Sequence, residues 1–532
     1  MKQPRMVVRV ILLLSVLAMV AAACGNDNGG GTGGAKATSV VWGTTDSVTS
    51  NDPAKCYEFF CGNVAQVVYS RLVSYPAEGS DIKPDAASKL PEVSSDGLTY
   101  TFTLKDGLKF SDGSALDSAA VKYSIDRVVN LKISGSAAFL ITDSMKSVAA
   151  PDAKTVVFTL KQPDATFLSK LTFNIASIVN PKVIAADKVA DNKTIGGSAW
   201  YKMDPSGYVE GQSMRLDANS YSIFGAPKTK TILIKFFKSS SALKLALQNK
   251  EVDVAFHTFL PTEVKDLKAN SAITTTGPGL GRIRFLVQNV KQKPFDNENV
   301  RKAVAASLSR AKLIEDAFDN TVTPLYSMLR SSFGEYKDVF KTTYGDTVDK
   351  TKVDKYLADA GIAAGTKVPI TLWASTNHYG DSEQDAQESI RRQLEETGRF
   401  TVTSKTEDWA AFRPDLAAPP SGKFGLFLLG WFPDYFDPDD YFSPFIGTDG
   451  AKSQGSFFSD ASVDAKIKQE QGSTDQAVRG PIFTELQQLI ADKALYVPLW
   501  EEAEYIFTQK SVTGSKLDLT SFLRVEELVK AA

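Results

Sequence analysis

The chain has 532 residues and is 43% hydrophobic, so it can bury two or three ordinary domain cores. Charged residues make up 23%, with 36 glycines and 23 prolines, which argues against disordered, collagen-like, coiled-coil and polytopic membrane classes. The net charge is −2, and the balance gives no electrostatic reason to bind nucleic acid. Because the chain has only two histidines and three cysteines, we expect neither a histidine-rich metal site nor a multi-cysteine cluster.

The N-terminus has a secretory pattern. Three basic residues and no acid precede an apolar run of 14 residues, 10–23, that ends directly before Cys24. This run is short of the roughly 20 residues that a transmembrane helix needs. Residues 17–24 resemble a bacterial lipobox, in which cleavage exposes a cysteine that takes a diacylglycerol; ordinary signal-peptidase cleavage beside an incidental cysteine is the alternative. We expect residues 1–23 to be a lipoprotein signal peptide and Cys24 to be lipidated.

A glycine-rich segment follows the cysteine. Residues 25–36 contain six glycines and have no apolar face to bury, so residues 24–36 should form a tether reaching roughly 20 Å. The sequence therefore predicts a protein held by lipid at the outer face of the bacterial cell membrane, which is the periplasmic side if the host has two membranes.

Cys56 and Cys61 are the remaining cysteines and lie five residues apart. In an exported protein the pair can form a disulfide that closes a local loop. Metal binding is the alternative, but it would need two further ligands. We predict a disulfide between Cys56 and Cys61.

The body alternates strands and helices. Apolar side chains at every second position from Leu98 to Leu104 predict a strand with one buried face, and Asp117 is placed to cap a helix from Ser118. In chain order, strands are expected at 40–42, 98–104, 156–160, 231–237, 252–256, 283–287, 370–373 and 424–429, and helices at 118–128, 167–171, 243–247, 300–308, 382–397 and 474–492. The pattern is α/β with no internal repeat.

Several motifs carry a resemblance to a known family. Residues 95–127 contain the run Ser-Asp-Gly-Leu-Thr-Tyr-Thr-Phe-Thr-Leu-Lys-Asp-Gly-Leu-Lys-Phe-Ser-Asp-Gly-Ser and continue to Asp-Arg. Supporting matches, in the same order along the chain, are 247–253, 295–296, 300–304 and 430–438. The sequence resembles the family 5 solute-binding proteins of bacterial ABC importers, which bind peptides, nickel complexes and opines.

The resemblance implies a two-lobe periplasmic-binding-protein fold of type II, an α/β fold with a hinged cleft. Lobe one would comprise residues 37–283 and 495–532, with an extra subdomain at 76–194, and lobe two would comprise 284–494. The hinge strands would cross near Arg284 and near residues 497–498. A ligand closes such a hinge only by contacting the closed state better than the open state.

The ligand-facing candidates follow the Gly-Trp motif. In peptide-binding relatives an aspartate of this motif, matching Asp434, binds the peptide's α-ammonium, and Trp431 and Tyr435 would line the same place. Arg413 is a candidate for a peptide carboxylate, and His378 follows a strand where loops often reach a cleft. The alternatives are a turn cap for Asp434, core packing for the aromatic residues, and a surface role for Arg413 and His378.

The resemblance implies a monomeric binding protein that captures di- or oligopeptides and delivers them to a membrane permease and its ATPase, with no cofactor and no catalysis. A sugar, an opine or a metal chelate stays open as the ligand. A secreted hydrolase is the alternative from another class, although no Gly-x-Ser-x-Gly, His-Glu-x-x-His or phosphate-loop motif is present. A surface sensor or adhesin on the same fold is the third possibility.

Overall fold

The computed structural model describes residues 38–531 except 258, 377 and 381. The predicted signal peptide, Cys24 and the glycine-rich tether lie outside the described residues. Within the described part of the chain, no helix combines the length and the apolar character needed to cross a membrane.

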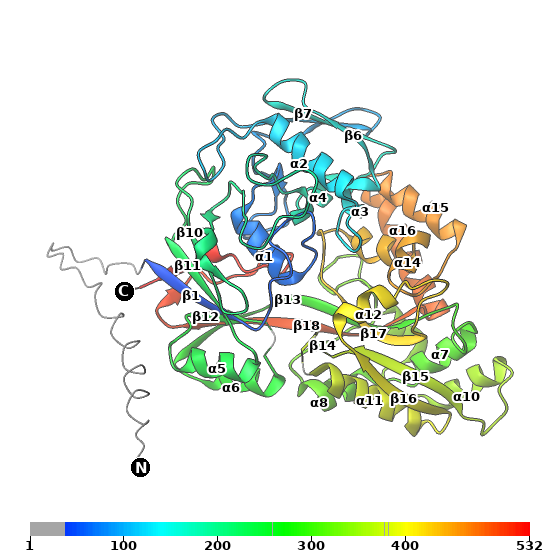
Figure 1. The fold of residues 1–532 in the computed structure, drawn as a ribbon. Helices are drawn as coiled ribbons and strands as arrows, with labels where there is room; N and C mark the ends of the chain where they lie inside the picture. Colours follow the sequence, from blue (N-terminus) through cyan, green and yellow to red (C-terminus); the bar gives the residue numbers. More distant parts are fainter. Residues whose placement is uncertain (1–37, 258, 377, 381, 532) are drawn as a thin grey trace, which may run out of the picture.

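One large mixed sheet runs through the molecule (Figure 1). Its main path, in spatial order, is β16 (Phe400–Glu407), β15 (Val368–Ser375), β17 (Leu426–Trp431), β13 (Ile273–Gln288), β18 (Tyr496–Gln509), β12 (Val254–Phe256), β1 (Ser39–Thr44), β11 (Thr231–Phe236), β10 (Ser213–Ala218) and β8 (Tyr201–Lys202). Two short strands, β14 (Thr323–Pro324) and β9 (Tyr208–Val209), pair with β18 and β10. Parallel pairs flank β1 and β15, as expected for an α/β chain.

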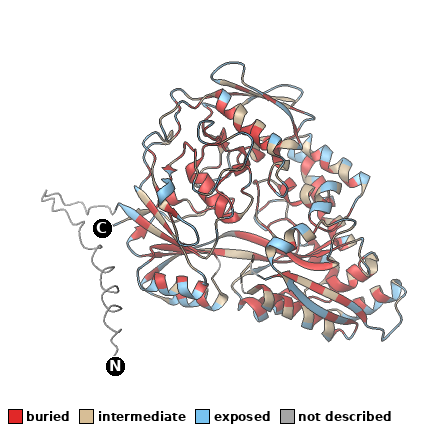
Figure 2. Cartoon of the chain, in the orientation of Figure 1, coloured by how far each residue is buried: buried red, intermediate tan, exposed pale blue. Residues whose placement is uncertain are grey.

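The two longest strands, β13 and β18, connect the halves of this sheet and are largely buried (Figure 2). They pair antiparallel, with register shifts between Thr276 and Gly279 and between Leu280 and Ile283. The predicted strand at 283–287 is too short, because the glycine-rich segment before it has no alternating pattern. The backbone of this glycine-rich segment is held in the sheet by its pairing with β18. A side chain at Gly281 would lie 2.3 Å from the carbonyl oxygen of Glu502, so this close approach requires glycine.

The hydrophobic cores divide the molecule into two halves, which share the large sheet. The largest core lies on the side of β15, β16 and β17 and draws its residues from 283 to 500. The opposite half of the large sheet has two cores, one of them around Trp42 and Ile234 and the other around Leu243 and Phe507. Helices lie on both faces of the sheet (Figure 1), and its central strand β17 is buried along most of its length, whereas the edge strand β16 is largely exposed.

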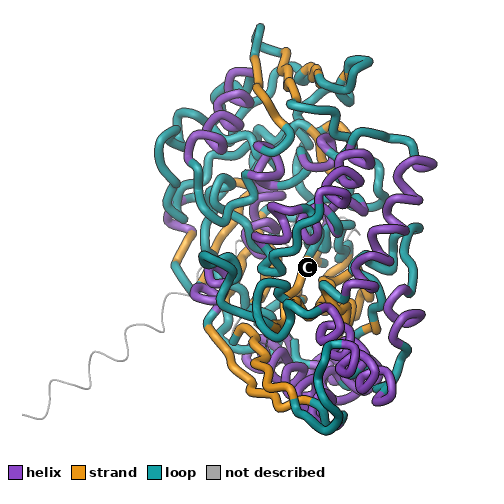
Figure 3. Tube along the Cα trace, turned by 90° about the vertical axis from the view of Figure 1, so that its right-hand side faces the viewer, coloured by secondary structure: helices purple, strands orange, loops and turns teal. Residues whose placement is uncertain are grey.

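A fourth core belongs to a small antiparallel sheet of order β4 (Glu92–Val93), β5 (Thr99–Thr103), β7 (Thr155–Leu160) and β6 (Met145–Ala149). This sheet forms the top of the molecule in the side view (Figure 3). Alternate residues of β5 and β7 are buried against helix α2 (Ser118–Leu131), which confirms the period-two prediction. The core also draws on Ala54, Leu72 and Val73, from before the predicted subdomain boundary at residue 76.

Helix α2 begins where the sequence predicts. The Asp117 side chain accepts a hydrogen bond from the Ala120 amide at 3.0 Å, which satisfies a helix N–H that has no partner within the helix. Further along this helix, both Arg127 Nη atoms donate to the carboxylate of Asp52, at 2.8 and 2.5 Å, and both side chains are buried. The family-like run at 95–127 therefore has a structural role here.

The remaining helices are α1 (Phe59–Val68), α3 (Phe139–Thr142), α4 (Phe167–Lys170), α5 (Ser240–Gln248), α6 (Pro261–Ala269), α7 (Glu298–Ala306), α8 (Arg310–Phe318), α9 (Val339–Tyr344), α10 (Lys350–Asp359), α11 (Ser382–Glu396), α12 (Trp409–Asp415), α13 (Ser443–Ile446), α14 (Thr448–Ser453), α15 (Ala461–Gln471) and α16 (Gln476–Lys493). The short strands β2 (Val73–Ser74) and β3 (Lys83–Pro84) pair with each other, as do β19 (Val512–Thr513) and β20 (Val529–Lys530).

Candidate functional site

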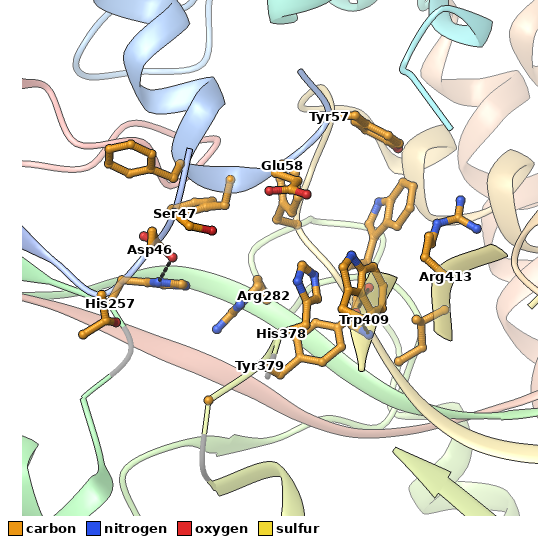
Figure 4. A pocket seen from close by; sticks show the side chains of 18 of the residues that line it. Asp46, Ser47, Tyr57, Glu58, His257, Arg282, His378, Tyr379, Trp409 and Arg413 are labelled. Carbon is orange, nitrogen blue, oxygen red and sulfur yellow. Dashed lines mark hydrogen bonds and ion pairs between the residues drawn. The ribbon is translucent and has the colours of Figure 1, made fainter. Parts of the chain in front are cut away.

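A cavity of about 470 Å³ opens between the two halves of the large sheet (Figure 4). Its lining comes from the loop after β1, the start of α1, the start of α5, the residue after β12, the middle of β13, the loop after β15, helix α12 and the end of β17. The polar and aromatic residues of the lining include Asp46, Tyr57, Glu58, Lys238, Ser239, Ser240, His257, Arg282, His378, Trp409, Arg413, Trp431 and Asp434. Both halves of the molecule therefore contribute to one site.

Asp434 is the buried carboxylate of this site. Only 1% of the residue is exposed, and the Tyr57 hydroxyl donates to its Oδ2 at 2.8 Å. Its backbone amide donates to Oδ2 of Asp440 at 3.0 Å. Among the described residues, Asp434 has no lysine, arginine or histidine partner in an ion pair, so its negative charge lacks a matching cation.

Burial controls the protonation of this pair of carboxyl groups. It raises the pKa of Asp434 to about 7, against the opposing effect of the hydrogen bond from Tyr57. Burial, and then the charge of Asp434, raise the pKa of Asp440 well above its usual range. Burial therefore favours the protonated form of both carboxyl groups, and a cation that enters the cavity would favour ionisation of Asp434.

Trp431 and Trp409 contribute two indole rings to the aromatic lining of the cavity. Trp431 is 8% exposed; its Nε1 donates to Oδ2 of Asp440 at 3.2 Å, and its ring meets Phe445 edge to face. The imidazole of His378 stacks on Trp409 with ring centroids 3.8 Å apart and planes 4° apart. Burial, followed by the charges of Arg282 and Arg284, lowers the pKa of His378 to about 3. His378 is therefore a neutral, aromatic part of the wall.

The structure brings together four of the five ligand-facing residues expected from the sequence. Asp434, Trp431, Arg413 and His378 all line the cavity. Tyr435 does not: its ring belongs to the core of the small antiparallel subdomain, and its hydroxyl donates to Asp439 at 2.8 Å. The chain bends at residues 434–437, after the end of β17, and Tyr435 packs into that core while Asp434 lines the cavity.

Arg413 lies at the Tyr57 end of the cavity, while Asp46 and His257 lie at the other end (Figure 4). Its Nη1 donates to the carbonyl oxygen of Ser453 at 3.2 Å. No carboxylate of the described residues forms an ion pair with it.

The other end of the cavity has a histidine–aspartate pair. Nδ1 of His257 lies 3.6 Å from Oδ1 of Asp46, as an ion pair rather than a hydrogen bond. Burial and Arg282 lower the pKa of His257, but the charges of Asp46 and Glu504 outweigh them and raise it overall. Arg282 itself is held by Glu502, with Nε donating to Oε2 at 2.7 Å.

Cys56 and Cys61 are joined by a disulfide, with Cα atoms 5.8 Å apart. The loop that it closes contains Tyr57 and Glu58, which both line the cavity. The disulfide therefore restrains the segment that supplies the hydrogen bond to Asp434.

Sequence reasoning missed Tyr57, Asp46, His257, Arg282 and Asp440. The position of Tyr57 between two paired cysteines and of His257 directly after a strand were available signals. No local pattern marked Arg282, because it lies in the glycine-rich half of β13. Among the described residues, no group of three or more histidine, cysteine, aspartate or glutamate side chains could hold a metal ion.

The family model of the bacterial extracellular solute-binding proteins, family 5, matches residues 81–453, which is most of the chain. The chain belongs to this family. Among curated relatives, a glutathione-binding protein of Pectobacterium atrosepticum is 28% identical over 510 residues, covering 92% of this chain and 93% of the relative. A probable D,D-dipeptide-binding periplasmic protein of Escherichia coli is 26% identical over 479 residues, covering 87% and 88%.

Solved structures support the fold. A dipeptide-binding protein of Pseudoalteromonas sp. SM9913, in complex with Met-Leu, superimposes with a TM-score of 0.81 at 18% identity, covering 92% of this chain and 100% of that one. A periplasmic binding protein of Helicobacter pylori, in complex with the peptide STSA, gives 0.79 at 20% identity, covering 93% and 98%. The family 5 protein therefore has the two-lobe periplasmic-binding-protein fold.

Proposed function

We propose that this family 5 solute-binding protein captures short peptides in its cleft by their α-ammonium group. The observation that carries the proposal is Asp434, a buried carboxylate in the cavity wall with no cationic partner among the described residues. A peptide ammonium that enters a closed cleft loses its water and needs a buried carboxylate in exchange.

The surroundings of Asp434 suit such a ligand. The hydrogen bond from Tyr57 fixes the orientation of the carboxylate, and the amide of Asp434 is held by Asp440, so little side-chain entropy is lost on binding. The indole face of Trp431 excludes water and favours a nearby cation. A cavity of about 470 Å³ lies within the range that holds small organic ligands.

We propose lesser roles for the two other sequence candidates in the cavity. His378 is neutral and stacked, and would pack against the ligand instead of carrying charge. Arg413 would donate to a ligand carbonyl or carboxylate near the ammonium end.

The wider role that we propose is delivery to an ABC permease and its ATPase from a lipid anchor at Cys24. The names of the two curated relatives, a glutathione-binding and a probable dipeptide-binding protein, support a peptide ligand. In this proposal residues 37–283 and 495–532 form lobe one, residues 284–494 form lobe two, and ligand binding closes them about β13 and β18.

Native mass spectrometry of the mature protein, extracted gently from its host with detergent, tests the proposal. Retained masses that fragment as peptides are the expected result, and a single non-peptide mass would refute the peptide assignment. Asp434→Asn should lose the retained peptides. Asp81→Asn, which removes an equally large charge from an exposed side chain, is the matched control and should keep them.

A further inference from the structure

A second, smaller cavity adjoins the first, between helices α6 and α8, which lie below β13 and β18 in Figure 1. Its volume is about 100 Å³, and it shares His257, Arg282 and Tyr379 with the first cavity. Further lining comes from the loop after β12, the start of α6, the end of α8 and strand β18. The proposed peptide site does not use this second cavity.

Glu504 is the unpartnered carboxylate of the second cavity. It is 7% exposed, and it lines the second cavity but not the first. Among the described residues it forms neither a hydrogen bond nor an ion pair. The residue that pairs with it across the sheet is Gly279, which has no side chain to offer as a donor. A carboxylate as buried as this one needs a cation or a donor in place of its lost water.

The neighbouring cations are already matched by other carboxylates. Three cations lie around the middle of β13, and each has its own acidic partner: His257 with Asp46, Arg282 with Glu502 and Arg284 with Glu383. Glu504 is a fourth carboxylate, so this group of side chains carries at least one unmatched negative charge when Glu504 is ionised. Burial raises the pKa of Glu504, against the opposing charge of His257, and a cation bound beside the carboxylate would favour its ionised form.

Aromatic rings form much of the wall around Glu504. The phenyl and phenol rings that line the second cavity belong to Phe259, Phe318, Tyr379, Tyr505 and Phe507. Phe259 and Phe507 meet edge to face, with ring centroids 5.4 Å apart. Nζ of Lys268 lies 4.4 Å from the ring centroid of Tyr505, but Lys268 is not part of the cavity lining. Aromatic faces beside a buried carboxylate favour an organic ammonium group, whose alkyl groups pack on the rings.

We infer that the second cavity is a binding site for an organic ammonium group, with Glu504 as the counter-ion and the aromatic rings as the wall. This site does not depend on the proposed peptide function. Two sources have the required chemistry: a free small cation of the choline type, and a lysine side chain of a peptide held in the first cavity. The structure favours the free cation, because a lysine side chain would have to pass His257 and Arg282, which line both cavities.

Calorimetric titration of the full-length mature protein with choline tests the site. The reference ligand is the neutral analogue of choline, in which carbon replaces the charged nitrogen and the shape is kept. We expect choline to bind at least about 10-fold more tightly than this analogue, because only the charged form interacts with both the carboxylate and the ring faces. Equal binding of the two ligands would refute a site for a free cation.

Three variants locate the bound cation. Glu504→Gln keeps the shape of the side chain and removes its charge, and should weaken choline binding at least about 10-fold. Phe259→Leu replaces one half-buried ring and should weaken binding about 3-fold. Asp434→Asn is the matched control, because Asp434 is a second buried carboxylate without a cationic partner among the described residues, and it should leave choline binding unchanged. Loss of binding in Asp434→Asn but not in Glu504→Gln would assign choline to the first cavity and refute the inference.

A pair of peptides separates the two sources of the ammonium group. One retained peptide is synthesised with lysine and with norleucine at the same position, and the wild type and Glu504→Gln are titrated with both. A preference for lysine that Glu504→Gln removes, without binding of free choline, assigns the site to a peptide side chain.

The outcomes keep this site and the peptide function apart. Absence of both choline binding and a lysine preference refutes the site, and the peptide function still stands if Glu504→Gln retains peptides. If the wild type retains no peptide, the peptide function fails and the choline titration alone decides the site.

Discussion

The pKa of Asp434 makes ligand binding sensitive to acid. In the empty protein burial raises this pKa to about 7, whereas an ammonium bound beside the carboxylate would lower it. At pH 5 the empty protein therefore has Asp434 protonated, and binding must first remove that proton. Because each pH unit below the pKa costs about 1.4 kcal/mol, two units weaken binding about 100-fold, or by about 2.7 kcal/mol.

The assay is titration calorimetry of one retained peptide at half-unit steps between pH 5 and pH 8. Affinity should rise about 10-fold per unit up to pH 7, level off, and fall again where the peptide's own amino group loses its proton near pH 8. Asp434→Asn should bind weakly and lack the acid limb. A wild-type affinity that is constant from pH 5 to pH 7, or an unchanged acid limb in Asp434→Asn, would refute this reasoning.

The same shift has a consequence for the stability of the empty protein. A carboxyl group whose pKa is raised by folding stabilises the native state below its unfolded pKa, and this contribution is lost as pH rises through the folded value. Asp434 should therefore destabilise the empty protein progressively up to about pH 7. Asp434→Asn should raise the melting temperature more at pH 8 than at pH 5, as thermal unfolding would measure.

Three further predictions concern anchoring and stability. Cys24→Ala should move the protein from the membrane fraction to the medium or periplasm, and retention on membranes by immunoblotting would contradict the lipid anchor. Replacing Cys56 and Cys61 by alanine should lower the free energy of unfolding by about 2 kcal/mol in denaturant titrations, because a short loop is no longer closed in the unfolded chain. Arg127→Met should cost 3–5 kcal/mol, on the order expected for an uncompensated buried charge at Asp52; a loss below about 1 kcal/mol would show that the pair is solvated.

Local sequence patterns were sufficient for some of the elements. The alternation in β5 and β7 and the Asp117 cap of α2 depend on contacts within a few residues. Periodicity and capping rules were therefore enough to predict them. The family-like run at 95–127 has a structural role, since Arg127 is buried against Asp52. The first half of β13 escaped prediction, because pairing with β18 holds this glycine-rich segment in the sheet.

The sequence by itself determined the fold class, the family resemblance, and the candidates Asp434, Trp431, Arg413 and His378 that line the cavity. Only the tertiary structure decided that Tyr435 packs into a separate core and that Tyr57 reaches Asp434 from 377 residues away. The physical reason is that burial and electrostatic pairing are properties of the space around a group. A sequence identifies the carboxyl groups that are available, but the fold decides which of them is buried away from water and left without a cationic partner.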